Sequence, residues 1–185
     1  MVYSLDEGLE SLLHRFKDFG PEYRWIGALF GSLAIEFFTN HLQCIEERYG
    51  KIDIFAVPPA GGASRNFDHM AEIIHSVRPW RTSWDLSLLK KKRNKKDERG
   101  QVDTECYDLS PGRGVEGKRV LFLDDTWTSG STLASAAAAA KRHGAQKVVA
   151  VTIGRQLKKE WGTGRDIAQA ALRRRYDVGR CVICA

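Results

Sequence analysis

The chain has 185 residues, of which 43% are hydrophobic and 28% charged, and it carries a formal net charge of +6. These values are typical of a soluble globular protein of one ordinary domain that buries a real core. No apolar run approaches the ~18 residues that a membrane-spanning helix needs, and the acidic amino end lacks the basic and apolar regions of a signal peptide. The sequence therefore predicts a cytosolic protein with no membrane partner.

The first fifty residues are predicted to be helical. Apolar side chains recur at helical spacing from Leu5 to Phe16, and Gly20-Pro21 breaks that pattern. A second helix is predicted from Trp25 to Tyr49, with Gly50 as its C-terminal stop. A short apolar strand then covers Ile52–Val57.

A proline- and glycine-rich loop follows this strand, from Pro58 to Arg65. Its prolines stop the strand, its glycines allow a backbone to approach a ligand closely, and Arg65 adds a cation. A tight turn without a ligand is the alternative interpretation. The next helix is predicted from Phe67 to Val77, with Asn66 or Asp68 as its N-cap.

Alternating apolar residues predict a half-buried strand over Ser83–Leu88. A lysine-rich run begins where that strand ends, and from Lys90 to Arg99 it carries seven basic and two acidic residues, a net charge of +5. Because the chain from Lys90 to Thr104 is too polar to bury itself, it is predicted to be a mobile loop. A shorter strand is expected near Cys106–Leu109.

The stretch that carries most chemical information runs from Val120 to Thr132. Four apolar residues, Val120–Leu123, predict a buried parallel strand, and Asp124 and Asp125 follow at its carboxyl end, where open α/β sheets bind ligands. The loop Thr126–Thr132 is rich in hydroxyl groups and leads into a helix, so its side chains and backbone N–H groups could hold a phosphate.

The acid pair suits a different part of the same ligand. Carboxylates repel a phosphate, but they accept hydrogen bonds from a sugar diol or bind a divalent cation. A ligand with a phosphate at one end and a diol nearby is a ribose 5-phosphate. The alternative is a solvated Asp-Asp turn with Ser131 as an ordinary helix N-cap.

A helix over Thr132–His143, a strand over Lys147–Ile153 and a helix over Gly164–Arg174 complete the predicted elements. We expect one domain in three parts: a helical amino-terminal hood segment (1–50), a ligand-binding core (51–155) and a C-terminal helix and tail (156–185).

The four cysteines are expected to be reduced in the cytosol. Only Cys181 and Cys184 have the spacing of metal ligands. A zinc site completed by Cys44, Cys106 or a partner chain is one option, but a frayed terminus with two free thiols is the favoured one.

The segment Val120–Thr132 resembles the phosphoribosyl-pyrophosphate (PRPP) signature of type I phosphoribosyltransferases. The resemblance implies an α/β fold with a central, mostly parallel sheet flanked by helices, a flexible basic lid, and transfer of phosphoribosyl from PRPP with Mg²⁺. By this resemblance Asp124 and Asp125 are catalytic and hold Mg²⁺ directly or through water. The 5-phosphate would be bound by Thr126, Trp127, Thr128, Ser129, Gly130, Ser131 and Thr132. Pyrophosphate would be bound by Ala60, Gly61, Gly62 and Arg65, and the lid would comprise Lys90, Lys91, Lys92, Arg93, Lys95 and Lys96.

Within this superfamily the chain is most similar to ComF-like, competence-associated proteins, on the segments Ala56–Pro58 and Gly117–Asp125. It lacks their amino-terminal cysteine module, and Trp127 stands where an aliphatic residue is usual. The alternatives to catalysis are a PRPP sensor or a protein that binds single-stranded DNA through the lysine run. The sequence leaves the small-molecule acceptor open, and a homodimer is a further option.

Overall fold

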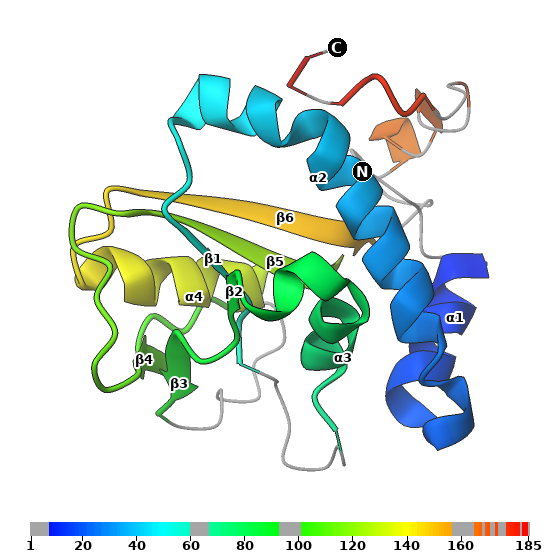
Figure 1. Cartoon of the computed structure of the whole chain (residues 1–185), viewed down its shortest axis with the longest axis horizontal. Helices are drawn as coiled ribbons and strands as arrows, with labels where there is room; N and C mark the ends of the chain where they lie inside the picture. Colours follow the sequence, from blue (N-terminus) through cyan, green and yellow to red (C-terminus); the bar gives the residue numbers. More distant parts are fainter. Residues whose placement is uncertain are drawn as a thin grey trace.

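The computed structural model describes residues 8–59, 67–92, 101–156, 165–167, 169–170, 173, 177–181 and 183–184. A parallel β-sheet has helices packed on both of its faces (Figure 1). This arrangement confirms the predicted α/β fold with a central parallel sheet.

The central sheet contains β1 (Ile54–Ala56), β2 (Trp84–Asp85), β5 (Arg119–Trp127) and β6 (Lys147–Arg155), in the order β2-β1-β5-β6. All three pairings between these strands are parallel. The two inner strands β1 and β5 pair through Ile54 and Val120, Phe55 and Leu121, and Ala56 and Phe122. The parallel arrangement brings the carboxyl ends of these strands to one edge, where ligands bind in such sheets.

One face of the sheet is covered by α1 (Gly8–Asp18), α2 (Ile26–Tyr49) and α3 (His69–Ser76). The short 3₁₀ helix η1 (Pro21–Tyr23) lies between α1 and α2, and η2 (Arg78–Arg81) follows α3. The apolar side chains of these helices form one core with Leu121 and Leu123 of β5. Helix α2 ends at Gly50, whose φ of 87° lies in the left-handed region that suits glycine, as predicted. Asp68 caps α3 by accepting hydrogen bonds from the N–H groups of Met70 and Ala71.

The other face is covered by α4 (Ser131–Arg142) and by a two-stranded antiparallel sheet of β3 (Leu89–Lys91) and β4 (Tyr107–Leu109). Buried alanines of α4 pack with Val120 and Phe122 of β5 in a second core. Because neighbouring strand residues face opposite ways, β5 contributes alternately to the two cores. This burial on both faces explains its uninterrupted apolar run.

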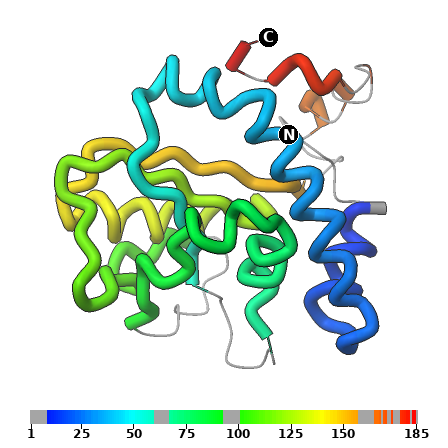
Figure 2. The backbone as a smooth tube through the Cα atoms, viewed as in Figure 1, coloured from blue at the N-terminus to red at the C-terminus, as the bar shows by residue number. Residues whose placement is uncertain are grey.

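The C-terminal segment, red in Figure 2, lies beside α2. Residues 165–167 and 169–170 are helical, within the helix predicted over Gly164–Arg174, and much of the rest of that range lies outside the described residues. Within the part of the chain that is described, no helix has the length and apolar character to cross a membrane.

Candidate functional site

The two carboxylates of the signature lie inside β5 rather than after it. The strand was predicted to end at Leu123, but its pairing with β6 continues until Trp127 lies opposite Arg155. The alternation along the strand directs Asp125 towards α1 and α3 and Asp124 towards the opposite face. The predicted pair is therefore two carboxylates in different surroundings.

Asp125 is buried and paired with two basic side chains. Its Oδ2 lies 2.5 Å from Nζ of Lys17 on α1 and 2.8 Å from Nε2 of His69 on α3. Burial alone would raise the pKa of Asp125, but the hydrogen bond from His69 and the charge of Lys17 outweigh it and hold the pKa well below its ordinary value. Asp125 is thus an ionised carboxylate that joins α1, α3 and β5.

Asp124 is half-buried, and one oxygen of its carboxyl group accepts a hydrogen bond of 2.9 Å from the backbone N–H of Asp125. Burial, followed by the negative charge of Asp125, raises the pKa of Asp124 to about 7. Near neutral pH the protonated and ionised forms of this carboxyl are therefore both populated. A sugar hydroxyl or a cation that prefers the ionised form would shift it towards that form.

Donor atoms from the two carboxylates and the imidazole converge at this edge of the sheet. One atom from each of His69, Asp124 and Asp125 lies within 4.8 Å of the others. The Nδ1 atom of His69 is buried and has no hydrogen-bond partner within the described ranges. The cluster combines hard oxygen donors with an imidazole, although Lys17 already occupies Oδ2 of Asp125.

The predicted phosphate loop is shorter than expected at both ends, because Thr126 and Trp127 belong to β5 and α4 begins at Ser131. Thr128 and Ser129 are exposed. The Ser129 hydroxyl accepts from the backbone N–H of Ser131 at 3.3 Å and donates to the Ser131 hydroxyl at 3.0 Å. The first turn of α4 contains no acidic residue, so no side chain of that turn competes with an anion for its N-terminal N–H groups.

Gly130, rather than Ser131, is the N-cap residue of α4, so the predicted alternative of a Ser131 cap is wrong. Gly130 has a φ of 76°, and a Cβ atom there would overlap the indole ring of Trp127. Only glycine satisfies both the left-handed backbone and the close approach of the indole. Trp127 and Gly130 together fix the bend of the loop between β5 and α4.

The lysine-rich run does not begin as an irregular loop. Lys90 and Lys91 lie in β3, paired with β4, and the backbone N–H of Lys92 donates to the Cys106 carbonyl at 2.8 Å. The prediction of a loop from Lys90 is wrong here, because Leu88 and Leu89 are buried in the second core and hold this strand against β4. The backbone N–H of Asp103 also donates to the Ser135 hydroxyl on α4, at 3.0 Å.

Several predicted site residues lie outside the described residues. They are the pyrophosphate-loop residues Ala60, Gly61, Gly62 and Arg65, and the lid residues Arg93, Lys95 and Lys96.

Two site residues were not predicted from the sequence at all. Lys17 occupies a polar position of an amphipathic helix, and His69 follows the cap of α3; neither position has a local pattern that indicates a partner. Their shared contact with Asp125 depends on residues more than fifty positions away in the chain. Only the alternation of β5, once extended past Leu123, indicates that Asp125 faces this side.

The family model for the phosphoribosyl transferase domain matches residues 38–162, more than half of the chain. The chain belongs to the phosphoribosyltransferase family. The matched range contains the acid pair, the hydroxyl-rich loop and the β3–β4 sheet, so the resemblance on the signature to type I phosphoribosyltransferases is confirmed at the level of the family.

Two individual proteins are similar to this chain. A ribose-phosphate pyrophosphokinase from Hyphomonas neptunium is 36% identical over 106 residues, which are 57% of this chain and 30% of that protein. The chain thus spans less than a third of the length of this curated relative. The crystal structure of a hypoxanthine phosphoribosyltransferase from Staphylococcus aureus aligns with a TM-score of 0.36 and 17% identity, over 65% of this chain and 61% of that one.

Proposed function

We propose that this protein binds Mg²⁺ and PRPP and transfers the phosphoribosyl group to a nucleobase or amine, with release of pyrophosphate. The observation that carries the proposal is the path from β5 into α4. Two carboxylates, exposed hydroxyls and the start of a helix follow one another at the carboxyl edge of a parallel sheet, within the range that matches the family.

The 5-phosphate would bind between Thr128 and the first turn of α4. The N-terminal N–H groups of a helix favour an anion, and the hydroxyl groups of Thr128 and Ser129 are exposed beside them. The buried Ser131 hydroxyl is already bonded to Ser129, so its part is to hold the loop in shape.

The ribose hydroxyls would bind mainly to Asp124. Its oxygens are the less encumbered of the pair, because Asp125 already accepts from Lys17 and His69. Hydrogen bonds from a diol favour the ionised carboxylate, whose charge also stabilises positive charge that develops on the ribose. Asp125 would act by positioning, since it fixes α1 and α3 against β5.

The donor set fits Mg²⁺ in part. Carboxylate oxygens are ligands that Mg²⁺ prefers, and Asp124 could hold the ion directly or through water. Direct binding at Oδ2 of Asp125 would compete with Lys17. When bound, Mg²⁺ would supply positive charge that neutralises the pyrophosphate.

The reaction breaks the bond between C1 of the ribose and the pyrophosphate oxygen and forms one from C1 to an acceptor nitrogen. The electron pair of the broken bond leaves with pyrophosphate, and the acceptor N–H proton passes to solvent. Such a reaction is catalysed by positioning and electrostatics, so no side-chain nucleophile is required. Basic residues of the lid and of the loop Ala60–Arg65 would assist the departure of pyrophosphate.

Titration of PRPP in the presence of Mg²⁺ tests the donor site. We expect the Asp124→Asn variant to bind PRPP about 10-fold to 100-fold more weakly than wild type, the loss expected for a hydrogen bond to a charged group. Asp124→Asn with Asp125→Asn should bind more weakly still. The matched control is Glu47→Gln, which removes an exposed carboxylate from α2 without touching the site. Equal affinity of wild type and a folded double variant would refute the assignment.

The acceptor is identified by a screen of nucleobases, amines and ammonia for PRPP-dependent release of pyrophosphate. Release with one defined acceptor supports the transferase. PRPP binding without release for any acceptor supports the second candidate, a ComF-like PRPP sensor that has lost catalysis.

Binding of single-stranded DNA, the other form of this second candidate, rests on the net charge of +5 between Lys90 and Arg99. Clustered cations bind nucleic-acid phosphates without reading bases, and this binding weakens with salt. Within the run, Lys92 already lies 3.9 Å from the carboxylates of Glu105 and Asp108. If single-stranded DNA is the ligand, neutralising Lys90, Lys91, Lys95 and Lys96 should abolish binding at moderate salt, whereas Lys51→Gln, on an exposed residue outside the run, should not.

A further inference from the structure

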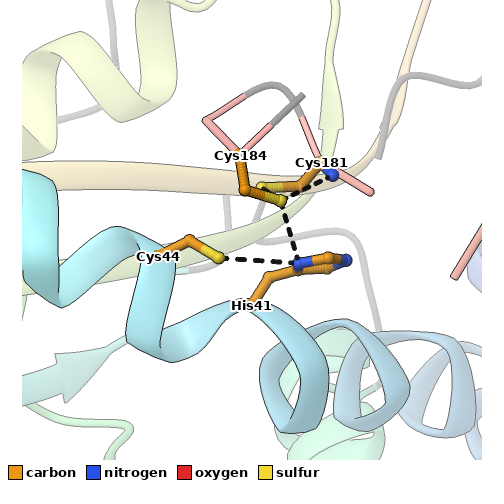
Figure 3. Close-up of side chains that lie close together, drawn as sticks. All are labelled: His41, Cys44, Cys181 and Cys184. Atoms are coloured by element: carbon orange, nitrogen blue, oxygen red, sulfur yellow. Dashed lines mark hydrogen bonds between the residues drawn. The ribbon is translucent and has the colours of Figure 1, made fainter. Parts of the chain in front are cut away.

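Three thiols and one imidazole meet where the C-terminal segment lies on α2 (Figure 3). His41 and Cys44 are three residues apart and so share one face of the helix. Cys181 and Cys184 approach that face from the tail. One potential ligand atom from each of the four lies within 4.8 Å of all the others.

The spacing of these atoms matches a tetrahedral metal site. Nδ1 of His41 lies 3.8 Å from Sγ of Cys44 and 3.7 Å from Sγ of Cys184, and the sulfurs of Cys181 and Cys184 are 3.4 Å apart. With zinc–sulfur and zinc–nitrogen bonds of usual length, the edges of a tetrahedron are about 3.8 Å between sulfurs and about 3.6 Å between sulfur and nitrogen. The four side chains are therefore arranged around a point that an ion could occupy.

His41 is held in the form that a metal requires. The imidazole is 4% exposed, and its Nε2 lies 2.8 Å from the carbonyl oxygen of Val178. Since a carbonyl can only accept, Nε2 carries the hydrogen, and in the neutral ring the lone pair is on Nδ1, which faces the sulfurs. Zinc-binding histidines commonly donate their second N–H in this way.

Backbone N–H groups also donate hydrogen bonds to the sulfur atoms of Cys181 and Cys184. The N–H of Cys181 donates to Sγ of Cys184 at 3.3 Å, and the N–H of Ile183 donates to Sγ of Cys181 at 3.4 Å. These donors stabilise negative charge on the sulfurs, which a metal ligand must carry. Cys106, by contrast, is buried in the second core with α4 and takes no part.

We propose that His41, Cys44, Cys181 and Cys184 bind one structural Zn²⁺ ion. Three soft thiolates and an imidazole in tetrahedral arrangement select zinc over Mg²⁺, and four protein ligands leave no position for a substrate. The ion would fix the C-terminal tail to α2, which belongs to the amino-terminal hood segment. The described residues of the tail make packing contacts rather than fraying, because Ile183 lies against the core of α1–α3 and the Val178 carbonyl accepts a hydrogen bond from His41.

The first measurement is the zinc content of the purified full chain, kept reduced and dialysed against buffer without chelator. We expect one zinc ion per chain, and cobalt substitution should give the visible absorption bands of tetrahedral Co²⁺ with thiolate ligands. Neither readout depends on a variant. A reduced, folded chain that retains no zinc after zinc addition and dialysis would overturn the proposal.

Variants then assign the ligands. Cys181→Ser with Cys184→Ser, and separately His41→Ala, should lose the zinc and the cobalt bands, with folding checked by circular dichroism. Cys106→Ser is the matched control, since it removes a cysteine outside the cluster and should keep one zinc ion. Zinc that stays with the His41 and tail variants, or that leaves with Cys106, would refute this ligand set.

Discussion

At the scale of single residues, Asp125 shows how a carboxylate of the signature is kept ionised. It is 3% exposed, and two basic groups lie within hydrogen-bonding distance of one oxygen. A charge buried to this degree is tolerated only when paired, so Lys17 and His69 are needed for the fold of the site as well as for its chemistry. Asp124, one residue earlier, forms no ion pair within the described ranges and is left available for a ligand, although the charges of Lys17 and His69 also act on it.

Replacing Lys17 by methionine should destabilise the protein. The change keeps the aliphatic stem but removes the charge 2.5 Å from Asp125, which leaves a buried carboxylate with His69 alone. We expect a loss of about 1–3 kcal/mol in the free energy of unfolding, measured with urea at neutral pH.

The control is Lys51→Met, which removes an exposed lysine and should leave stability nearly unchanged. Adding Asp125→Asn to Lys17→Met should recover part of the loss, because the uncompensated charge is then gone. Equal stability of wild type and Lys17→Met would show that the contact contributes nothing.

The raised pKa of Asp124 predicts a pH dependence of stability. In the folded, metal-free protein this pKa is about 7, whereas in the unfolded chain it is near 3.8. Between these values the folded state binds more protons than the unfolded state, so stability falls as the pH rises from about 4 to about 7. The lowered pKa of Asp125 acts in the opposite sense and below this window, where stability is lost as the pH falls.

Urea unfolding in the presence of EDTA measures this effect across the window. The Asp124→Asn variant should lose the decline attributed to Asp124, and the difference from wild type should reach about 4 kcal/mol across the window, or about 1.4 kcal/mol for each pKa unit. Parallel curves for the two proteins would show that Asp124 titrates normally. Asp108→Asn, at a half-buried carboxylate paired with His143, controls for loss of charge as such.

At the scale of elements, the bend between β5 and α4 depends on one glycine and one indole. Gly130→Ala should destabilise the protein and weaken PRPP binding, because the left-handed backbone disfavours a side chain and the new methyl group would overlap Trp127. The left-handed backbone alone should lower the free energy of unfolding by about 1–2 kcal/mol. The overlap with the indole of Trp127 should lower it further.

Gly112→Ala separates the two causes. Gly112 has a φ of 77°, nearly that of Gly130, but nothing lies within 4 Å of a Cβ placed there. We expect Gly112→Ala to show the backbone cost only and to bind PRPP normally, and Trp127→Ala to relieve part of the cost of Gly130→Ala. If Gly130→Ala were no worse than Gly112→Ala, the indole contact would be irrelevant.

Local sequence patterns predicted most of these elements. Some features depend only on residues close together in the chain, and these are the apolar run of β5, the cap at Asp68 and the stop at Gly50. The strand, the helices and their order could therefore be predicted. The end of β5 could not, because its ladder is prolonged by pairing with β6 rather than by any residue of its own. The same limit applies to β3, where lysines lie in a strand because Leu89 anchors it.

Contacts between distant segments account for the rest of what sequence could not predict. Lys17 and His69 meet at Asp125 from two different helices, and His41 meets Val178 across 137 positions. The local periodicity of a sequence does not indicate contacts of this kind between distant segments. The cysteine pair 181/184 was visible in the sequence, but its partners on α2 were fixed only by how the tail lies on that helix.

At the scale of the whole molecule, α2 connects the predicted amino-terminal segment to the sheet. Phe38, 7% exposed, packs against Trp80 of η2 and Trp84 of β2, with ring centroids 5.6 Å and 5.7 Å away. The same core includes Leu121 and Leu123 of β5 and Ile153 of β6. Because one apolar core joins α1–α3 to the sheet, we predict that the amino-terminal segment and the core unfold together as one domain.

Phe38→Ala tests this cooperativity. We expect it to reduce the free energy of unfolding by about 3–5 kcal/mol, the cost of a large-to-small change in a packed core. Tryptophan fluorescence, which reports Trp80 and Trp84 among the five tryptophans of the chain, and far-ultraviolet circular dichroism, which reports the helices, should shift to the same new midpoint. Leu29→Ala, at a residue of the same helix that is 40% exposed, should change stability far less. Two separate transitions, with only the fluorescence midpoint moved by Phe38→Ala, would instead show that the helical segment and the sheet are independent units.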